Sequence, residues 1–150
     1  MGALISMMAG LAILGAQEAA ESRGVYLISS ADTVFLLPLE GLSRGGPVRT
    51  GTLVGAYQRQ DESDVLWTET EFEFDCASER ITPLRSVKVR IDGSRQIEQT
   101  DPSEDVEGFQ DWPPIAIMRE AVCSDIDLAP YALADWRAAL PELTATLEPY

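Results

Sequence analysis

Acidic side chains alternate strictly with threonine, phenylalanine and cysteine over residues 68–76 of the stretch 68–80, which reads Thr-Glu-Thr-Glu-Phe-Glu-Phe-Asp-Cys-Ala-Ser-Glu-Arg. A period of two residues is typical of a β-strand that turns one face to the core. The inward face ends in Phe72, Phe74 and Cys76. The opposite face is a row of carboxylates, formed by Glu69, Glu71, Glu73 and Asp75. We take this strand, predicted over 65–76, as the element around which the fold is organised.

Shorter segments of the same kind lie on both sides of this strand, separated by turn residues. They predict strands over 24–30, 33–37, 48–58, 79–92 and 95–100, with a tight turn at 77–78. The pair Asp92-Gly93 predicts a two-residue hairpin turn of type I′, which needs positive φ at both positions. Successive strands joined by such turns predict an antiparallel sheet of about six strands, arranged as hairpins.

The hairpin that follows Cys76 is specific enough to predict a register. Across a two-residue turn, Phe74 faces Ile81 and Asp75 faces Arg80, which pairs apolar with apolar and acid with base. Further from the turn, near Glu71 and Leu84, the apolar side chains of the two strands no longer face each other. We therefore expect a β-bulge close to Pro83.

Two helices are predicted near the C-terminal end. Residues 112–123 have proline in their first turn and carry Ile115, Met118 and Val122 on one face. A second helix over 130–140 carries Leu133, Trp136 and Leu140 and is stopped by Pro141. The predicted fold class is therefore α+β, an antiparallel sheet packed against a C-terminal helix.

The N-terminal residues predict export. Residues 3–16 form an uncharged apolar run, shorter than the roughly 20 residues that a membrane-spanning helix needs. We expect residues 1–20 to be a signal peptide, residues 22–125 the folded domain, and residues 126–150 a C-terminal extension with a short helix. The product would then be periplasmic, extracellular or on the cell surface, with no stable membrane span after removal of the leader. The alternatives are a buried N-terminal helix and a retained leader that tethers the domain to a membrane.

The two cysteines are interpreted together with the leader. An even cysteine count in an exported chain predicts a disulfide, here between Cys76 and Cys123, which pins a helix to the central strand. The alternatives are two buried free thiols or a redox-active pair, although the Cys-X-X-Cys spacing of redox motifs is lacking.

Composition excludes several classes of function. The chain has 150 residues, 45% of them hydrophobic, as expected for a single globular domain. A formal charge of −14 disfavours nucleic acid, whose binding requires clustered Lys and Arg. The absence of histidine removes Ser-His-Asp and Cys-His catalysis and the commonest transition-metal ligand. We expect no catalytic residue, no cofactor and no metal site.

The carboxylate row on the central strand is interpreted as a solvated face. Side chains two residues apart on a strand lie about 7 Å apart, whereas calcium needs six or more oxygens within about 2.6 Å. An exported hydrolase that uses a carboxylate pair is the alternative function, because glycoside hydrolysis requires only two carboxylates at a suitable separation. Trp112, next to two prolines, is the predicted exposed aromatic contact for a protein partner.

The chain resembles the surface-adhesin protein E family of bacterial exported proteins. The resemblance lies in Glu71-Phe-Glu-Phe-Asp-Cys76, the basic strand and hairpin at 87–97, Trp112-Pro113 and the run that ends in Ala-Val-Cys123. It implies an antiparallel sheet packed on a helix, a bridged cysteine pair and a non-enzymatic role in adhesion to host matrix or envelope proteins. No binding residue is carried over by it, and the sequence specifies neither a ligand nor an oligomeric state.

Overall fold

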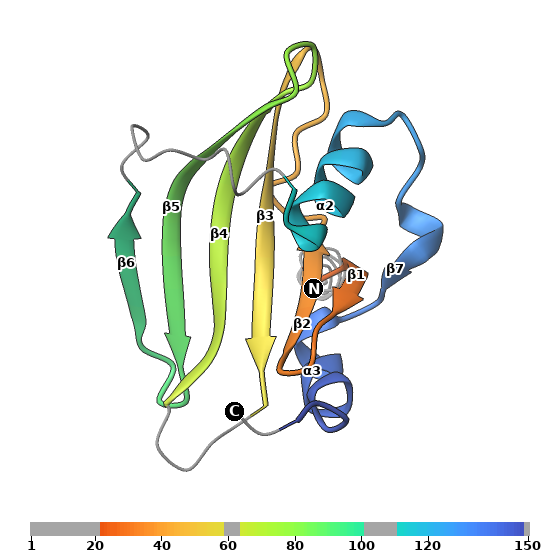
Figure 1. The fold of residues 1–150 in the computed structure, drawn as a ribbon. Helices are drawn as coiled ribbons and strands as arrows, with labels where there is room; N and C mark the ends of the chain where they lie inside the picture. The colour runs from red at the N-terminus through yellow and green to blue at the C-terminus, as the bar shows by residue number, and fades with distance from the viewer. Residues whose placement is uncertain (1–21, 59–63, 101–110, 149–150) are drawn as a thin grey trace, which may run out of the picture.

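A single antiparallel sheet of seven strands with helices against both faces forms the protein (Figure 1). The structure is a computed structural model that describes residues 22–58, 64–100 and 111–148, so the predicted signal peptide lies outside the described residues. The strands are β1 (Gly24–Ser29), β2 (Thr33–Pro38), β3 (Val48–Tyr57), β4 (Val65–Asp75), β5 (Arg80–Arg90), β6 (Arg95–Gln99) and β7 (Ala132–Leu133). The helical segments are α2 (Pro113–Cys123), the 3₁₀ turn η2 (Ala129–Tyr131) and α3 (Trp136–Thr144).

The strands form an up-and-down meander. Their order across the sheet is β6-β5-β4-β3-β2-β1-β7, so each strand from β1 to β6 lies beside the next one in the chain. The predicted antiparallel sheet packed against a helix is confirmed, whereas the described chain is mostly β and its sheet has seven strands rather than about six. The seventh strand was not predicted, because β7 has only two residues and shows no period of its own.

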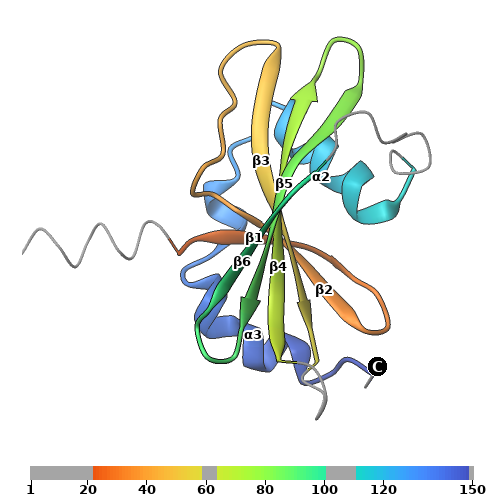
Figure 2. The same cartoon turned by 90° about the vertical axis from the view of Figure 1, so that its left-hand side faces the viewer.

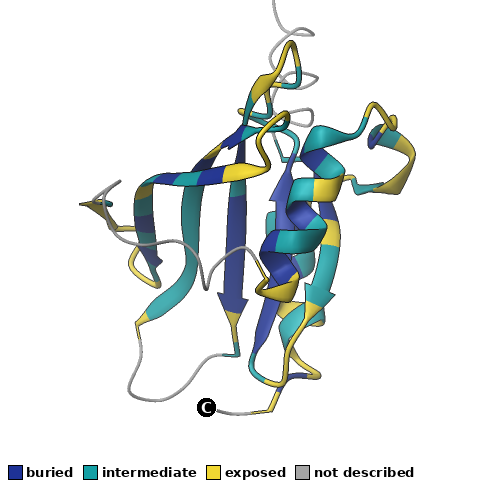
Figure 3. Ribbon diagram, turned by 45° about the horizontal axis from the view of Figure 1, so that its top comes forward, coloured by how far each residue is buried: buried dark blue, intermediate teal, exposed yellow. Residues whose placement is uncertain are grey.

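The first core lies between α2 and the sheet. The helix contributes Ile115, Met118 and Val122, the three side chains of its predicted apolar face, and all three are buried. The strands and the segment after α2 contribute Val25, Phe35, Leu37, Leu53, Phe72, Phe74, Ile81 and Leu128. Figure 3 shows the buried residues of α2 along the side that packs on the strands.

A second core occupies the opposite face, under α3 (Figure 2). Trp136 is fully buried, and its ring stands edge-on to that of Trp67, with 5.6 Å between the ring centroids. The other members are Val34, Leu36, Val54, Ala56, Leu140 and Leu147. Strand β2 alternates between the two cores and is buried at every residue. The C-terminal segment therefore contributes to both cores, with Trp136, Leu140 and Leu147 in the second and Leu128 in the first.

The predicted bounds of the second helix are wrong. Its N-cap is Asp135, whose carboxylate accepts a hydrogen bond from the backbone N–H of Ala138 at 3.1 Å. The helix continues through Pro141 to Thr144. Proline removes one intrahelical hydrogen bond, but burial of Trp136 and Leu140 holds this short helix against the sheet.

The predicted register of the β4–β5 hairpin is confirmed, with Phe74 opposite Ile81 and Asp75 opposite Arg80. The register shifts between Glu71 and Phe72, whose partners are Arg85 and Pro83, so the bulge falls where it was expected. The turn itself is longer than predicted. Strand β4 ends at Asp75, residues 76–79 form the turn, and Glu79 takes the left-handed conformation with φ 58°.

The type I′ prediction for Asp92-Gly93 is wrong. Gly93 has a φ of 81°, but Asp92 does not have positive φ. The Gly93 N–H donates to the Arg90 carbonyl at 2.9 Å, and the Arg90 N–H donates to the Ser94 carbonyl at 3.0 Å. These bonds describe a three-residue loop with one left-handed glycine. The Asp92 carboxylate accepts from the Ser94 N–H, and hydrogen bonding from Ser94 lowers the pKa of Asp92.

Candidate functional site

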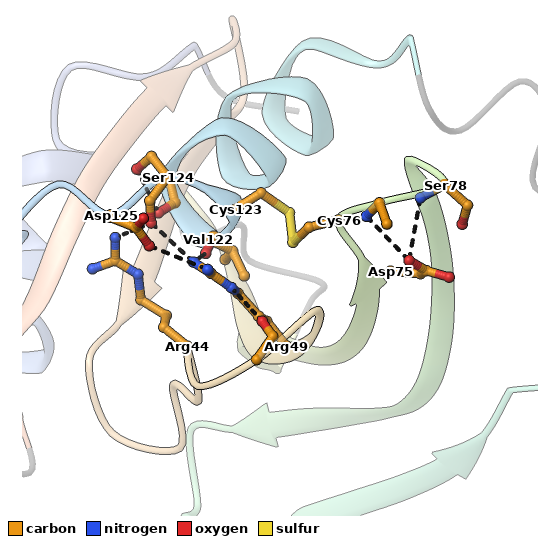
Figure 4. Close-up of a disulfide and its surroundings, with 12 residues drawn as sticks. Arg44, Arg49, Asp75, Cys76, Ser78, Val122, Cys123, Ser124 and Asp125 are labelled. Atoms are coloured by element: carbon orange, nitrogen blue, oxygen red, sulfur yellow. Dashed lines mark hydrogen bonds and ion pairs between the residues drawn. A yellow bond between two sulfur atoms is a disulfide. The ribbon is translucent and has the colours of Figure 1, made fainter.

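A disulfide joins the end of β4 to the end of α2 (Figure 4). It links Cys76 and Cys123, whose Cα atoms lie 5.6 Å apart. The bridge predicted from the sequence is therefore present, and its two cysteines are not available for redox or nucleophilic chemistry. Beside it, the Asp75 carboxylate accepts hydrogen bonds from the backbone N–H groups of Ala77 and Ser78 at 3.1 and 3.2 Å, which orders the turn.

Two arginines hold the same end of α2 from the other side. Arg49 on β3 donates to the carbonyls of Val122 and Ser124, both at 3.0 Å, and its side chain is only 13% exposed. Arg44 donates to the Ser124 carbonyl and, at 2.7 Å, to that of Ile126. Positive charge at a helix C-terminus also interacts favourably with the helix dipole. These hydrogen bonds and the disulfide hold the C-terminal end of α2 against the sheet.

The sheet edge formed by β7 and β1 is poorly suited to pair with another chain, and we call it the blunted edge. Strand β7 pairs with only Gly24 and Val25, and β1 carries a register shift between Tyr26 and Ile28. Short strands and bulges are devices that prevent a sheet edge from pairing with another chain. The Arg23 guanidinium also donates to the carbonyl of Ala129 at 2.8 Å, which fixes the 3₁₀ turn before β7.

At the opposite edge, no described residue pairs with the outer side of β6, and we call this the open edge. All five of its residues are exposed, and it pairs with β5 in an unbroken register. Ile97 at its centre has 59% of its surface exposed. Figure 2 faces this edge, and β6 stands in front of the other strands with neither helix over it.

Hydrogen bonds at both ends of β6 show which of its backbone groups point towards β5. Arg90 and Ser94 are bonded at one end, and at the other end the Thr100 N–H donates to the Leu84 carbonyl at 3.4 Å. Bonded and non-bonded pairs alternate along an antiparallel ladder. Counting from either end, the bonded residues of β6 are 96 and 98.

Arg95, Ile97 and Gln99 alternate with the bonded residues 94, 96, 98 and 100. Their N–H and C=O groups therefore point away from the sheet. The described residues provide no further strand beyond β6, so this row of donors and acceptors is the feature of the molecule best suited to bind another chain.

A cavity of about 200 Å³ adjoins the edge on the α3 face. It spans four strands and is lined by Thr52, Glu69, Glu71, Arg85, Val87, Arg95 and Ile97. Glu71 pairs with Arg85 at 2.8 Å, and Glu69 pairs with Arg95 at 2.7 Å. The lining combines apolar side chains with charged groups that are already paired with each other.

The carboxylates in this cavity accept hydrogen bonds and ion pairs from neighbouring side chains. Glu69 accepts a hydrogen bond from the indole N–H of Trp67 at 2.9 Å as well as the ion pair with Arg95. From the sequence we expect Lys88, Arg90 and neighbouring basic residues to neutralise part of the acidic row. The structure instead pairs the row with Arg85 and Arg95, while Lys88 pairs with Glu98 and Arg90 with Asp64.

Trp112, the predicted partner contact, immediately precedes α2. Its ring packs edge-on against Phe35, with 5.0 Å between the centroids, and the residue is 40% exposed. Phe35 belongs to the core on the α2 face, so Trp112 and the cavity lie on opposite faces of the sheet. The structure does not bring this residue together with the β6 edge.

Two features are absent from the described residues, a metal-binding cluster and a membrane-spanning helix. Within residues 22–58, 64–100 and 111–148, no group of three or more acidic or cysteine side chains is arranged to hold a metal ion. In the same ranges no helix is both long and apolar enough to cross a membrane.

No family model, no curated protein and no solved structure matches this chain. The resemblance to surface-adhesin protein E therefore rests on the residues quoted for it.

Proposed function

We propose that the protein is an exported, non-catalytic interaction module that binds a protein partner through the β6 edge and the adjoining α3 face. The observation that carries this proposal is the asymmetry of the sheet. The β7–β1 edge has a strand of only two residues and a bulge. The β6 edge is a continuous strand whose five residues are all exposed. Proteins usually protect such edges, so an unprotected one is a candidate contact surface.

The disulfide supports the exported location. Disulfides form and persist in oxidising compartments and are rare in the reducing cytosol. Cys76 and Cys123 close a large loop across the fold, which is typical of a structural bridge. The apolar N-terminal run and the resemblance to exported adhesins point to the same compartment, and the resemblance suggests an envelope or host matrix protein as the partner.

Site-specific crosslinking in the cells that produce the protein tests this function. A photoreactive phenylalanine derivative replaces Ile97 at the open edge or, as a matched control, Tyr131 near the blunted edge. Both positions are well exposed, at 59% and 68%. We expect a discrete adduct of higher mass only from position 97. Equal adducts from both positions, or none from position 97, would contradict the proposed surface.

A further inference from the structure

We propose that β6 accepts an extended, positively charged polypeptide segment as an additional strand of the sheet. This inference rests on the interaction function proposed above and specifies how the partner binds. In strand addition, backbone hydrogen bonds provide most of the affinity, and alternate side chains provide the selectivity.

The backbone of β6 has the geometry that an added strand requires. Arg95, Ile97 and Gln99 direct N–H and C=O groups outwards at every second residue, a spacing of about 7 Å. The bonded pairs of an antiparallel neighbour repeat at the same interval. The strand contains no proline, and its register with β5 has no shift.

The charged side chains of β6 do not guard its edge, because both are drawn back over the sheet. Arg95 reaches across β5 to Glu69, with 2.7 Å between Nη2 and Oε2. Glu98 pairs with Lys88 on β5 at 3.0 Å between Oε1 and Nζ. Outward charges are one of the usual barriers to edge pairing, and here both charges contact residues inside the edge.

The charge of the whole chain selects the kind of segment. The formal charge is −14, and ion pairs join four basic side chains of β5 and β6 to acidic partners: Arg85 to Glu71, Lys88 to Glu98, Arg90 to Asp64 and Arg95 to Glu69. A negative field of this kind attracts a cationic segment and repels a second copy of the same chain. A strand added to β6 would also place a side chain against the exposed Ile97, beside Val87 in the cavity wall, so we expect apolar residues to alternate with the basic ones.

Amide hydrogen exchange measured by NMR tests the inference on the full oxidised protein. The probe is the blocked peptide acetyl-Lys-Val-Lys-Val-Lys-Val-Lys-amide, with a Glu-for-Lys peptide and a peptide with a central proline as controls. At saturating peptide, exchange at Arg95, Ile97 and Gln99 should slow by about tenfold or more, as expected when an exposed N–H gains a hydrogen bond. Exchange at Gln96 and Glu98, which already bond to β5, should change little. Neither control peptide should protect the three outward amides.

A matched pair of variants separates strand addition from general attraction. Ile97→Pro removes the outward N–H and leaves the bonds from β6 to β5 intact, because residue 97 does not donate to β5. Ile97→Val keeps that donor and an apolar side chain. We expect Ile97→Pro to weaken peptide binding about tenfold and Ile97→Val to change it little. Circular dichroism of both variants verifies the fold. If Ile97→Pro disrupts it, Ile97→Lys, which replaces the apolar contact with a peptide valine by a charged side chain, should weaken binding instead.

Several results would overturn the inference. Peptide binding without protection of the three outward amides would place the site elsewhere, and absence of binding would exclude a cationic added strand. Equal binding of the Glu-containing peptide would refute the charge argument. Protection that appears without peptide and rises with protein concentration would show that a second copy pairs with β6. In each case a crosslink to a native partner at position 97 would still support the proposed function, so the two failures are distinguishable.

Discussion

Removal of the disulfide should cost much of the stability of the fold without abolishing it. The perturbation is the double substitution Cys76→Ser and Cys123→Ser. The two cysteines are 47 residues apart in sequence, and the chain-entropy model gives a stabilisation of about 4 kcal/mol for a closed loop of this length. Domains unfold with a free energy of about 5–15 kcal/mol, so the variant should still fold. The buried face of α2 and the hydrogen bonds from Arg49 remain to hold the helix.

The assay is urea unfolding followed by circular dichroism, with wild type and variant each measured with and without a thiol reductant. For a slope near 2 kcal/mol per molar urea, the midpoint should fall by about 2 M. The reductant should lower the wild-type midpoint to that of the variant and leave the variant unchanged. A loss below about 1 kcal/mol would refute the argument that this bridge restricts the unfolded chain.

Three further predictions concern single residues. Gly24→Ala would place a Cβ atom 2.9 Å from a ring carbon of the fully buried Trp136. The substitution should therefore lower the free energy of unfolding by about 1–3 kcal/mol. An unchanged melting temperature would contradict this packing. Arg49→Lys should lower the free energy of unfolding, measured in urea, by about 1.5–3 kcal/mol. An ammonium group cannot reproduce the planar hydrogen bonds to the two carbonyls of Val122 and Ser124 at the end of α2. Wild-type stability of this variant would show that these bonds contribute little. The pKa of Asp75 is lowered below 3.8, first by the side-chain hydrogen bond from Ser78 and then by the backbone N–H of that residue. Its contribution is therefore present above its unfolded pKa and lost as the pH falls through the lower folded one, and Asp75→Asn should flatten this part of an acid titration of stability.

The β4–β5 hairpin shows what a sequence pattern can predict. Strict alternation fixes which side chains face the core, and the Phe74–Ile81 pair then fixes the register. The bulge near Pro83 follows because the apolar sets of the two strands fall out of step. The disulfide follows from the position of Cys76 at the end of that apolar face together with the even cysteine count.

The turns and the second helix were harder to predict, since more than one local solution fits the same residues. Asp92-Gly93 suits a two-residue turn, but a three-residue loop uses the same glycine and requires positive φ at only one position. Pro141 usually stops a helix, and only the burial of Trp136 beneath the sheet shows why this helix continues. Tertiary packing of this kind leaves no periodic signal in a segment of nine residues.

The candidate site was outside the reach of sequence patterns for a different reason. Residues 95–99 were predicted as a strand, but whether a strand lies at an edge depends on the order of the whole sheet. The ion pairs that draw Arg95 and Glu98 inwards join residues on separate strands. The α2 anchors, Arg44 and Arg49, donate to backbone carbonyls more than 70 residues away, and such acceptors carry no side-chain signature.

Hydrogen exchange of the isolated protein, followed residue by residue, is the decisive measurement of whether β6 is an open edge. We predict fast exchange at the amides of Arg95, Ile97 and Gln99 and slower exchange at those of Gln96 and Glu98, at every protein concentration. Slow exchange at the three outward amides in dilute protein without a partner would show that another segment already covers the edge, and β6 could then not accept an added strand.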